Sequence, residues 1–500
     1  MADGLTLAID VGTGSARAAL VDRDGIILRV AAREHEQIVL QFGWAEQRPA
    51  QWWAGTVAAI RDLLDAMPEA RQVIEAIAAC GQMHGTVLVD DSGALTRETA
   101  PLWNDKRTVA AVAAFEAQHL PSDYLSLTGN PPTPAWPGFK LAWLRDHDPE
   151  AYRRAAHVLM PKDYINLRLT GERAMDRGDV SCSFLNDCAR HDWSPAMTNM
   201  LGLDVAKLPA VRDPRAILGA VTKEAAAETG LRAGTPVLVG SADYPAALLG
   251  AGVCRPGVAS DVTGTSCIMT VIAERPILDP EICNVATVEG GWGAFVLLET
   301  GGDAVRWARR ALHARALDYA GIMDKAETAP AGCDGLFFLP YLTGERLGAH
   351  RNARAQYFGL GAGHGQAHLD RALLEGVAFA GNRALHVMAE RAGQQVERVV
   401  ATSGGAKSPL WLKIKASAYN RPILVPREAE SGLIACAAMA ATATGRFSSV
   451  HAAVDAFVRY EPEIRPDPGW AEKYARMQPI FDRLYRQSQS LYDALDALSR

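Results

Sequence analysis

The sequence predicts an α/β protein with at least two domains. Its 500 residues exceed the usual size of one domain about threefold. Strand-like and helix-like segments alternate along the chain, which is typical of sheets covered by helices. A strand–turn–strand pattern at the N-terminus, AIDVGTGS at 8–15, reappears about halfway as ASDVTGTS at 259–266. This short repeat suggests two domains that open in the same way.

The N-terminal segment predicts three strands followed by a helix. Apolar runs cover 5–9, 16–21 and 26–30, and turn-forming residues separate them. From Pro49 the apolar residues recur at spacings of three and four, which predicts an amphipathic helix. A further strand over 73–79 is expected to follow.

The second half of the chain is expected to begin after a region rich in Pro and Gly at 209–240. We place the boundary between residues 244 and 245, after a short buried strand. A long helix is predicted over 369–392, because its apolar residues share one face. The chain from Trp470 onward is also predicted to be helical, with the last helix packing back on the first domain.

Composition and charge exclude several classes of protein. The hydrophobic fraction is 49%, and a formal net charge of −6 gives no electrostatic footprint for nucleic acid or an anionic membrane. The N-terminus lacks a basic segment of the kind that opens a signal peptide. Eight cysteines show no CxxC spacing, so we expect reduced, buried thiols in a cytoplasmic enzyme.

Two glycine-containing turns are candidates for phosphate binding. The first, Asp10 to Ser15, comes directly after a strand. Its glycines would let a phosphate approach the backbone amides, while Asp10 could hold a metal ion through water. The alternative is an ordinary hairpin turn. The second copy, Asp261 to Ser266, favours phosphate binding, because one nucleotide would meet both turns.

A third glycine turn, TSGGAKS at 402–408, follows another strand. It is not a Walker A motif, because Ala406 stands where glycine should precede the lysine. Ser408 and Pro409 have the residue types of a helix N-cap and first helical position. A strand-to-helix turn that simply requires glycine remains an equal alternative.

Polar side chains at loop positions suggest a binding site for a polyhydroxylated ligand. GQMHG at 81–85 ends a predicted strand, and WNDKR at 103–107 follows shortly after. Amide, imidazole, carboxylate and guanidinium groups together suit several hydroxyls. A lone His84 is more often structural, but its polar company favours a sugar site.

Asp243 is the candidate general base. It comes at the end of a short strand over 235–240, where a carboxylate can face a ligand. Asp243 or Ser241 could instead cap the helix whose first turn contains Pro245. Both roles are compatible if the side chain points toward the ligand.

These pieces resemble the FGGY family of carbohydrate kinases over nearly the whole chain. The resemblance rests on several motifs in order: GQMHG at 81–85, PLWND with Arg107, TGNPPTPAWPGFKLAWL at 128–144, PKDYINLRLTGE at 161–172, FLPYLTGER at 338–346, HLDRALLEG at 368–376 and SGGA at 403–406. It implies a two-domain fold of the actin, hexokinase and Hsp70 type (ribonuclease H-like) with an interdomain cleft. Residues 1–244 would bind the sugar and residues 245–500 the nucleotide.

The resemblance also implies a role for each candidate residue. Asp243 would be the catalytic base, and Asp10 would hold Mg²⁺ through water. The sugar would be bound by Met83, His84, Trp103, Asn104, Asp105 and Arg107. ATP would be bound by Gly12, Thr13, Gly14, Ser15, Arg17, Gly264, Thr265, Ser266, Gly404, Gly405 and Ala406.

The implied reaction is ATP-dependent phosphorylation of D-xylulose at its terminal hydroxyl, with Mg²⁺ bridging the phosphates. The partners would be a small sugar, no nucleic acid and no membrane, with a homodimer left open. Tyr244 stands where the D-xylulose kinases of this family have Asn or Gln, which leaves another ketose, polyol or sugar acid as an alternative. A non-catalytic, actin-like ATP-binding protein is the other alternative.

Overall fold

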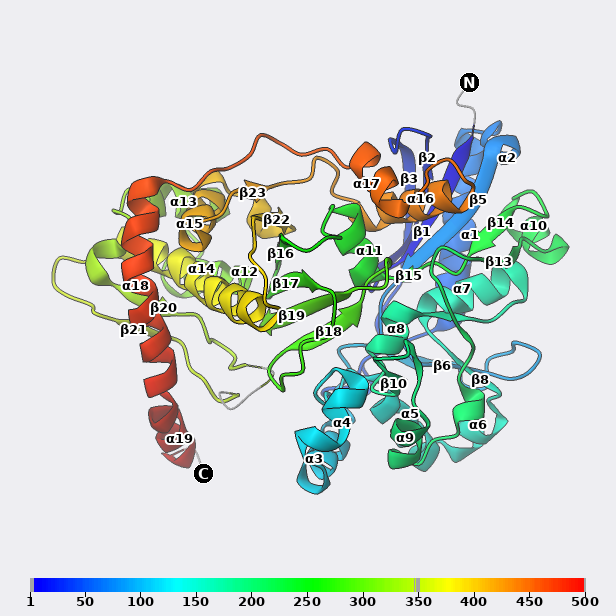
Figure 1. Cartoon of the computed structure of the whole chain (residues 1–500), viewed down its shortest axis with the longest axis horizontal. Coiled ribbons are helices and arrows are strands. Elements are labelled where there is room, and N and C mark those ends of the chain that lie inside the picture. The colour runs from blue at the N-terminus through cyan, green and yellow to red at the C-terminus, as the bar shows by residue number, and fades with distance from the viewer. Residues whose placement is uncertain (1–3, 346, 348–350, 499–500) are drawn as a thin grey trace. The chain divides into compact units, whose positions relative to one another are not determined.

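The computed structural model describes residues 4–345, 347 and 351–498, and the predicted α/β class is confirmed. Contacts divide the chain into two compact units (Figure 1). The first unit contains Met1–Cys254, Asn284–Gly293 and Glu430–Val458, and the second contains the remaining segments. Arg346, the last residue of the FLPYLTGER motif, lies outside the described residues.

The first unit is built on a seven-stranded sheet. Its order is β13-β14-β5-β1-β2-β3, and β15 pairs with the end of β5. The central strand β1 pairs antiparallel with β2 and parallel with β5. The strands of this sheet are β1 (Leu5–Val11), β2 (Ser15–Val21), β3 (Ile27–Glu34), β5 (Ile74–Gly81), β13 (Ile217–Ala220), β14 (Pro236–Leu238) and β15 (Ser241–Ala242).

Helices cover both faces of this sheet, so β1 is buried along its whole length. Leu7, Ile9 and Val11 pack toward α1 (Pro49–Ala66) and α7 (Pro161–Thr170). On the opposite face, Ala8 and its small neighbours pack against α16 (Ser431–Ala443) and α17 (Val450–Phe457), drawn in orange in Figure 1. The small side chains let α16 approach the sheet closely.

The remaining elements of the first unit are short. They are β4 (Glu46–Gln47), α2 (Ala70–Val73), β6 (Val87–Val89), β7 (Ala100–Pro101), α3 (Val109–Gln118), α4 (Pro121–Thr128), α5 (Pro137–His147), α6 (Pro149–Arg154), β8 (His157–Leu159), β9 (Met175–Asp176), α8 (Arg177–Ser181), β10 (Asn186–Asp187), β11 (Asp192–Trp193), α9 (Pro195–Met200), η1 (Val205–Lys207), β12 (Val211–Arg212), α10 (Lys223–Thr229) and α11 (Asp243–Gly250).

The second unit repeats the same opening. Strands β16 (Val258–Thr263) and β17 (Cys267–Ala273) form an antiparallel hairpin, and β16 pairs parallel with β22 (Arg398–Thr402). The sheet order is β18-β19-β17-β16-β22-β23. The predicted strand–turn–strand repeat is therefore confirmed in three dimensions.

The other elements of the second unit surround one large core. They are β18 (Cys283–Ala286), β19 (Trp292–Leu298), α12 (Gly302–Ala311), α13 (Tyr319–Glu327), η2 (Cys333–Gly335), β20 (Phe337–Leu339), β21 (Gln356–Phe358), α14 (Gln366–Arg391), η3 (Gly404–Lys407), α15 (Pro409–Tyr419), β23 (Ile423–Leu424), α18 (Pro468–Gln487) and α19 (Gln489–Leu498). Residues Asn284–Gly293, which include most of β18 and the start of β19, are grouped with the first unit.

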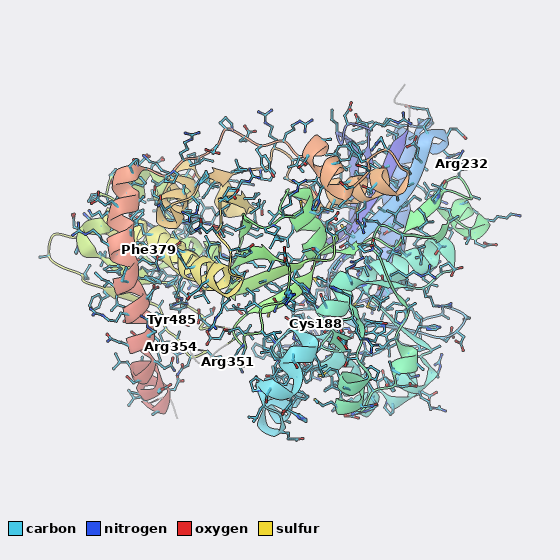
Figure 2. The ribbon with its side chains drawn as sticks, in the orientation of Figure 1. Cys188, Arg232, Arg351, Arg354, Phe379 and Tyr485 are labelled. Carbon is cyan, nitrogen blue, oxygen red and sulfur yellow. The ribbon has the colours of Figure 1, made fainter. Side chains whose placement is uncertain are left out.

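The helix α14 lies at the centre of this core. Its Phe379, labelled in Figure 2, contacts Tyr474 and Phe481 of α18 at ring distances of 5.4 and 5.6 Å. Such aromatic pairs add to the stabilisation that comes from burial alone. The helix predicted over 369–392 is thus found, beginning three residues earlier.

The division of the chain differs from the predicted boundary at 244/245. The first unit continues through α11 to Cys254, and residues 430–458 return to it. The cause is close packing: a Cβ on Gly250 of α11 would lie 1.7 Å from the carbonyl oxygen of Ser431. The final helix α19, expected against the first domain, is grouped with the second unit.

All eight cysteines are buried and unpaired, as predicted. Among the described residues no helix combines the length and apolar character needed to cross a membrane.

Candidate active site and nucleotide cavity

Three strand ends of the first unit bring the candidate catalytic residues together. Asp10 on β1 lies opposite Cys80 on β5, and Cys80 lies opposite Ser241 on β15. Because these three strands are parallel, their carboxyl ends share one edge of the sheet. Asp243 therefore leaves the sheet beside the turn that follows Asp10.

Asp10 forms part of a charged chain. Its Oδ2 pairs with Arg17, and Arg17 also pairs with Glu430 at the start of α16. The other oxygen of Asp10, Oδ1, is buried and has no partner among the described residues. Arg17, predicted to bind ATP, thus also compensates the charge of Asp10.

Asp243 is the first residue of α11, and Ala242 occupies the N-cap without a side-chain cap bond. The Asp243 carboxylate accepts backbone N–H groups of Tyr244 and Met83. Burial, together with the negative charge of Asp10, raises the pKa of Asp243 to about 7. A carboxyl group with this pKa can take up a proton efficiently near neutral pH.

A buried amide chain connects Gln82 to the first glycine turn. Gln82 Nε2 donates to Gln47 Oε1 at 2.9 Å, and Gln47 Nε2 donates to the Thr13 carbonyl at 2.6 Å. Trp52 Nε1 also donates to Gln47 Oε1, at 3.0 Å. Gln47 was missed in the sequence, where nothing distinguishes it from other polar residues before α1.

His84 adopts a left-handed backbone conformation with φ of 68°. Its carbonyl accepts a hydrogen bond from Lys140 Nζ at 2.9 Å, and its ring meets Trp136 edge-on at 5.0 Å. Lys140 is fully buried, and burial lowers its pKa to about 7. Met83, the residue before His84, is itself buried.

Trp103 and Asn104 lie on the loop that faces the first glycine turn. Trp103 is 40% exposed, and its Nε1 donates to Thr13 Oγ1 at 3.0 Å. Asn104 Nδ2 donates to Gln37 Oε1 at 3.1 Å.

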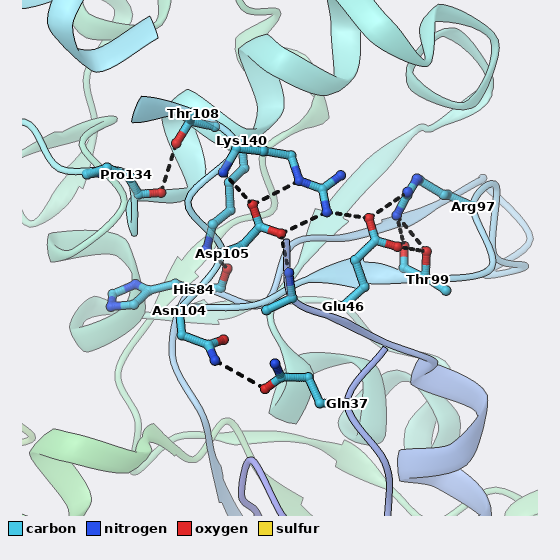
Figure 3. Close-up of polar contacts among 12 residues, drawn as sticks. Gln37, Glu46, His84, Arg97, Thr99, Asn104, Asp105, Thr108, Pro134 and Lys140 are labelled. Atoms are coloured by element: carbon cyan, nitrogen blue, oxygen red, sulfur yellow. Dashed lines mark hydrogen bonds and ion pairs between the residues drawn. The ribbon is translucent and has the colours of Figure 1, made fainter. Parts of the chain in front are cut away.

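Asp105 and Arg107 belong to a buried network, shown in Figure 3. One oxygen of Asp105 accepts from Arg107 Nε at 2.9 Å, and the other accepts the Ala45 backbone N–H at 2.7 Å. Arg107 also donates to Glu46 at 2.6 Å and lies 3.9 Å from the Trp44 ring centre. These bonds hold the loop that carries Trp103 and Asn104.

Several buried polar atoms near these strand ends have no protein partner among the described residues. They are Asp10 Oδ1, Gln82 Oε1, Asn104 Oδ1 and Ser241 Oγ. A buried acceptor without a partner costs about 1–3 kcal/mol, so native proteins keep few of them except where a ligand or water binds. A ligand with several hydroxyls would satisfy these groups.

The first glycine turn is a tight loop. Gly12 N–H donates to the Ser15 carbonyl at 3.0 Å, and His35 N–H donates to the Gly14 carbonyl at 3.1 Å. The side of Gly14 is open, since an added Cβ would meet no atom within 4 Å.

The second glycine turn is fixed against a helix. The carbonyls of Gly264 and Thr265 accept N–H groups from Gly301, Gly302 and Asp303 at 2.8 to 3.0 Å. An added Cβ on Gly302 would lie 2.5 Å from the Gly264 carbonyl oxygen, so only glycine permits this approach. Ser266 closes the turn by accepting the Gly264 N–H at 2.9 Å.

The third glycine turn, Gly404 to Ala406, packs on the second. An added Cβ on Gly405 would lie 2.7 Å from Thr263, whereas Gly404 is open on its other side. Ala406 turns toward the hydrophobic core. Ser408 caps α15 by accepting the Trp411 N–H at 3.2 Å, which confirms the predicted N-cap.

These two turns border a cavity of about 550 Å³ that lies wholly in the second unit. Gly264, Thr265, Gly404 and Gly405 line it, whereas Ser266 and Ala406 are absent from its wall. Its volume and largely apolar wall suit a planar base with a polar tail. The remaining lining comes from Gly302, Val305, Arg306, Tyr319, Ala320, Met323, Asp324, Lys407, Ser408, Pro409 and Trp411.

The sequence reasoning missed Gly302, Arg306 and the α13 residues of this wall. The glycine pair at 301–302 before an amphipathic helix was the available signal. The two Asp residues of the repeat also differ. Asp261 is fully buried and is neutralised by Lys415 Nζ at 2.8 Å, so it is a structural residue, unlike Asp10.

Comparison with known proteins supports one family. The model of the FGGY family of carbohydrate kinases matches residues 5–250 with its N-terminal domain and 259–444 with its C-terminal domain. A xylulose kinase of Bacillus subtilis is 27% identical over 99% of both chains. An autoinducer-2 kinase of Klebsiella pneumoniae is 29% identical over 98% of this chain and 95% of its own.

Solved structures agree. The crystal structure of xylulose kinase from Rhodospirillum rubrum has a TM-score of 0.92 and 32% identity, covering 98% of this chain and 100% of that one. The structure of gluconate kinase from Lactobacillus acidophilus, at 24% identity and with the same coverage, shares the fold with a TM-score of 0.91. The non-catalytic ATP-binding alternative is thereby removed. The chain belongs to the FGGY family of carbohydrate kinases and is an ATP-dependent carbohydrate kinase with the family's two-domain, actin-like fold.

Proposed function

We propose that this kinase phosphorylates D-xylulose at its terminal hydroxyl and produces D-xylulose 5-phosphate and ADP. The observation that carries the proposal is Asp243, a half-buried carboxylate with a pKa near 7 at the junction of three strand ends. Relatives named xylulose kinases, at 27 to 32% identity, support D-xylulose as the acceptor.

In the proposed reaction, the terminal hydroxyl oxygen attacks the γ-phosphorus as its proton passes to Asp243. The new O–P bond forms while the bond to the bridging oxygen of ADP breaks. Phosphoryl transfer of this kind depends mostly on positioning and charge stabilisation. The Met83 and Tyr244 backbone N–H groups orient the carboxylate of Asp243 for this step.

We propose that the open acceptors near the strand ends bind the sugar. Gln82 Oε1, Asn104 Oδ1 and Ser241 Oγ have no partner in the described protein, and sugar hydroxyls can donate to each. Asp105 and Arg107 would act as positioning residues, since their network holds the Asn104 loop. His84, Met83 and Trp103 complete the proposed sugar site.

The donor set of the first unit fits a magnesium ion. Mg²⁺ prefers oxygen ligands, keeps several waters, and commonly uses one or two carboxylates plus phosphate oxygens. Asp10 Oδ1 is a buried carboxylate oxygen without a partner in the described part of the chain, so Asp10 would hold the ion. When bound, Mg²⁺ neutralises charge that develops on the phosphate oxygens.

A substrate panel tests the proposal. Initial rates of ADP release are measured with D-xylulose, D-ribulose, glycerol and gluconate at matched concentrations. We expect kcat/KM for D-xylulose to exceed that for glycerol and gluconate at least about a hundredfold, because buried polar groups left unpaired penalise the wrong ligand. D-Ribulose, which differs at one stereocentre, should be a poorer but detectable substrate.

A second acceptor is favoured by Tyr244, which directly follows Asp243 in the first turn of α11. Similar proteins are named gluconate kinase and autoinducer-2 kinase, so a sugar acid or another polyol is the competing assignment. The Tyr244→Asn variant separates the two: it should raise turnover of D-xylulose if the pocket is otherwise built for it. A panel in which another acceptor exceeds D-xylulose would contradict the proposed substrate and leave the kinase chemistry intact.

A further inference from the structure

A second cavity of the second unit adjoins the cavity of about 550 Å³ beside the second and third glycine turns, which we propose as the ATP site and call the nucleotide cavity. Its volume is about 770 Å³, and it shares Arg306 and Tyr319 with the nucleotide cavity. The rest of its wall comes from α12, from the turn that follows α12 and from Leu342 and Thr343 after β20, and it includes Arg309, Arg310 and Arg315. We call this second cavity the arginine cavity, because Arg306, Arg309, Arg310 and Arg315 line it.

The wall of the arginine cavity carries an excess of positive charge. Its only carboxylate within the described residues is Asp303, which pairs with Arg306 at 3.1 Å. Across all the residues that the structure describes, no acidic side chain forms an ion pair with Arg309, Arg310 or Arg315. The whole chain is acidic, with a net charge of −6, so this local excess is not a property of the average surface.

Helix geometry directs three of the arginines to one side. Arg306, Arg309 and Arg310 stand at positions i, i+3 and i+4 of α12, which share a helix face. Arg309 is additionally fixed, because its Nε donates to the Leu317 carbonyl at 2.9 Å and its guanidinium lies 5.5 Å from the Tyr319 ring centre.

The fourth arginine comes from a strained turn. Ala314 and Arg315 have φ values of 46° and 65°, in the left-handed region that side chains other than Gly rarely adopt. The buried His313 anchors this turn by bonding Asp370 at 2.8 Å and Gln366 at 2.9 Å. Strain of this kind persists only where the surrounding structure enforces it, and it concentrates at ligand sites.

We propose that the arginine cavity binds a small molecule carrying two or more phosphate groups, at a site separate from the nucleotide cavity. The planar guanidinium group can form paired hydrogen bonds to phosphate oxygens. Four guanidinium groups supply more positive charge than one phosphate group needs, so a ligand with two or more phosphates fits the wall better. Because Arg306 lines both cavities, the ligand of the nucleotide cavity and the ligand of the arginine cavity compete for its guanidinium group. Binding of either ligand therefore weakens the other by the same factor.

Calorimetric titration with inorganic pyrophosphate tests this site. The test variant combines Arg310→Gln with Arg315→Asn, because Asn tolerates the left-handed backbone at 315. The control is Arg398→Gln, which removes an exposed arginine at the start of β22, at the strand end remote from the glycine turns. We expect the test variant to lose pyrophosphate affinity at least about tenfold and the control to keep it.

ADP affinity, measured on the same samples, separates this site from the nucleotide cavity. Neither Arg310 nor Arg315 lines the nucleotide cavity, so ADP binding should be unchanged in the test variant, and added ADP should weaken pyrophosphate binding to the wild type. If the double variant fails to bind ADP, the single Arg310→Gln variant carries the test. Pyrophosphate affinity that is undetectable in the wild type, or equal in the wild type and the folded test variant, would overturn the proposal.

Discussion

At the scale of single residues, the proposed chemistry depends on two neighbouring carboxylates with different surroundings. Asp10 pairs with Arg17, whereas Asp243 receives only backbone N–H groups. Burial raises the pKa of both, with Arg17 opposing the shift at Asp10. Carboxylates in unlike environments often divide the work of a reaction, and here Asp243 is the one suited to accept a proton.

The pH dependence of activity should report this arrangement. Asp243 must lose its proton before it can act as a base, so kcat/KM should rise with pH and level off above a pKa of about 7. Replacing Asp10 by Asn removes a like charge, and the rising limb should move roughly one pH unit lower. The measurement is kcat/KM from pH 5 to 9, with Asp65→Asn on the surface of α1 as the control.

A rising limb that stays at the same pH in the Asp10→Asn variant would contradict the coupling between the two carboxylates.

The raised pKa of Asp243 also makes the stability of the folded protein depend on pH. The folded protein holds the proton of Asp243 up to about pH 7, while the unfolded chain releases it near its ordinary value of 3.8. The protonated Asp243 therefore contributes to the free energy of unfolding at low pH, and this contribution is lost as the pH rises from about 3.8 through about 7.

The backbone conformation of Ser403 leads to a prediction about the stability of the protein. Its φ of 71° and ψ of −160° lie in a region that is nearly exclusive to glycine. Ser403→Gly should therefore raise the free energy of unfolding by about 1 kcal/mol. Urea denaturation measures the change, and Ser403→Ala, which keeps the Cβ, should give no such gain. A destabilised Ser403→Gly variant would show that the serine hydroxyl matters more than the strain.

At the scale of elements, each glycine turn joins a strand to the element that follows. Gly264 to Ser266 connects β16 and β17, and Gly404 begins the turn between β22 and α15. The parallel pairing of β16 with β22 places both turns at the same edge of the sheet. The proposed nucleotide cavity is the result, and its glycines keep the backbone open to a ligand.

Blocking one turn should weaken nucleotide binding. An added side chain at Gly404 meets only the Thr263 carbonyl oxygen, 3.9 Å away, so Gly404→Val should fold and project its methyl groups into the cavity. We expect ADP affinity to fall at least about tenfold, which corresponds to roughly 1.4 kcal/mol. Calorimetry measures it, with Gly363→Val in an open loop of the same unit as the control. Unchanged ADP affinity in the folded Gly404→Val variant would place the nucleotide elsewhere.

At the scale of the whole molecule, local patterns predicted the elements well. Strands β1, β2 and β5 and helices α1 and α14 lie where apolar periodicity and glycine turns placed them. The repeat correctly indicated two units with the same opening hairpin. These features depend on residues close together in the chain, and a sequence shows them directly.

Long-range packing could not be predicted in the same way. The return of residues 430–458 to the first unit depends on the contact of Gly250 with Ser431, which no local pattern shows. Similarly, Lys415 neutralises Asp261 from 154 residues away, so the two copies of the repeat look alike in sequence while their acids differ in role. Gln47 and Arg306 were missed because Gln82, the partner of Gln47, and the glycine turns beside Arg306 lie on other elements.

The Asp243→Asn variant tests the central claim, that Asp243 is the catalytic base, most directly. Loss of a positioned base costs roughly 10²- to 10⁴-fold in rate, so kcat for sugar-dependent ADP release should fall within that range. ADP affinity and the melting temperature should change little, because the nucleotide cavity belongs to the second unit and Asn preserves the shape of the side chain. A folded variant that retains more than about a tenth of the wild-type kcat would contradict the account and assign the proton to another group.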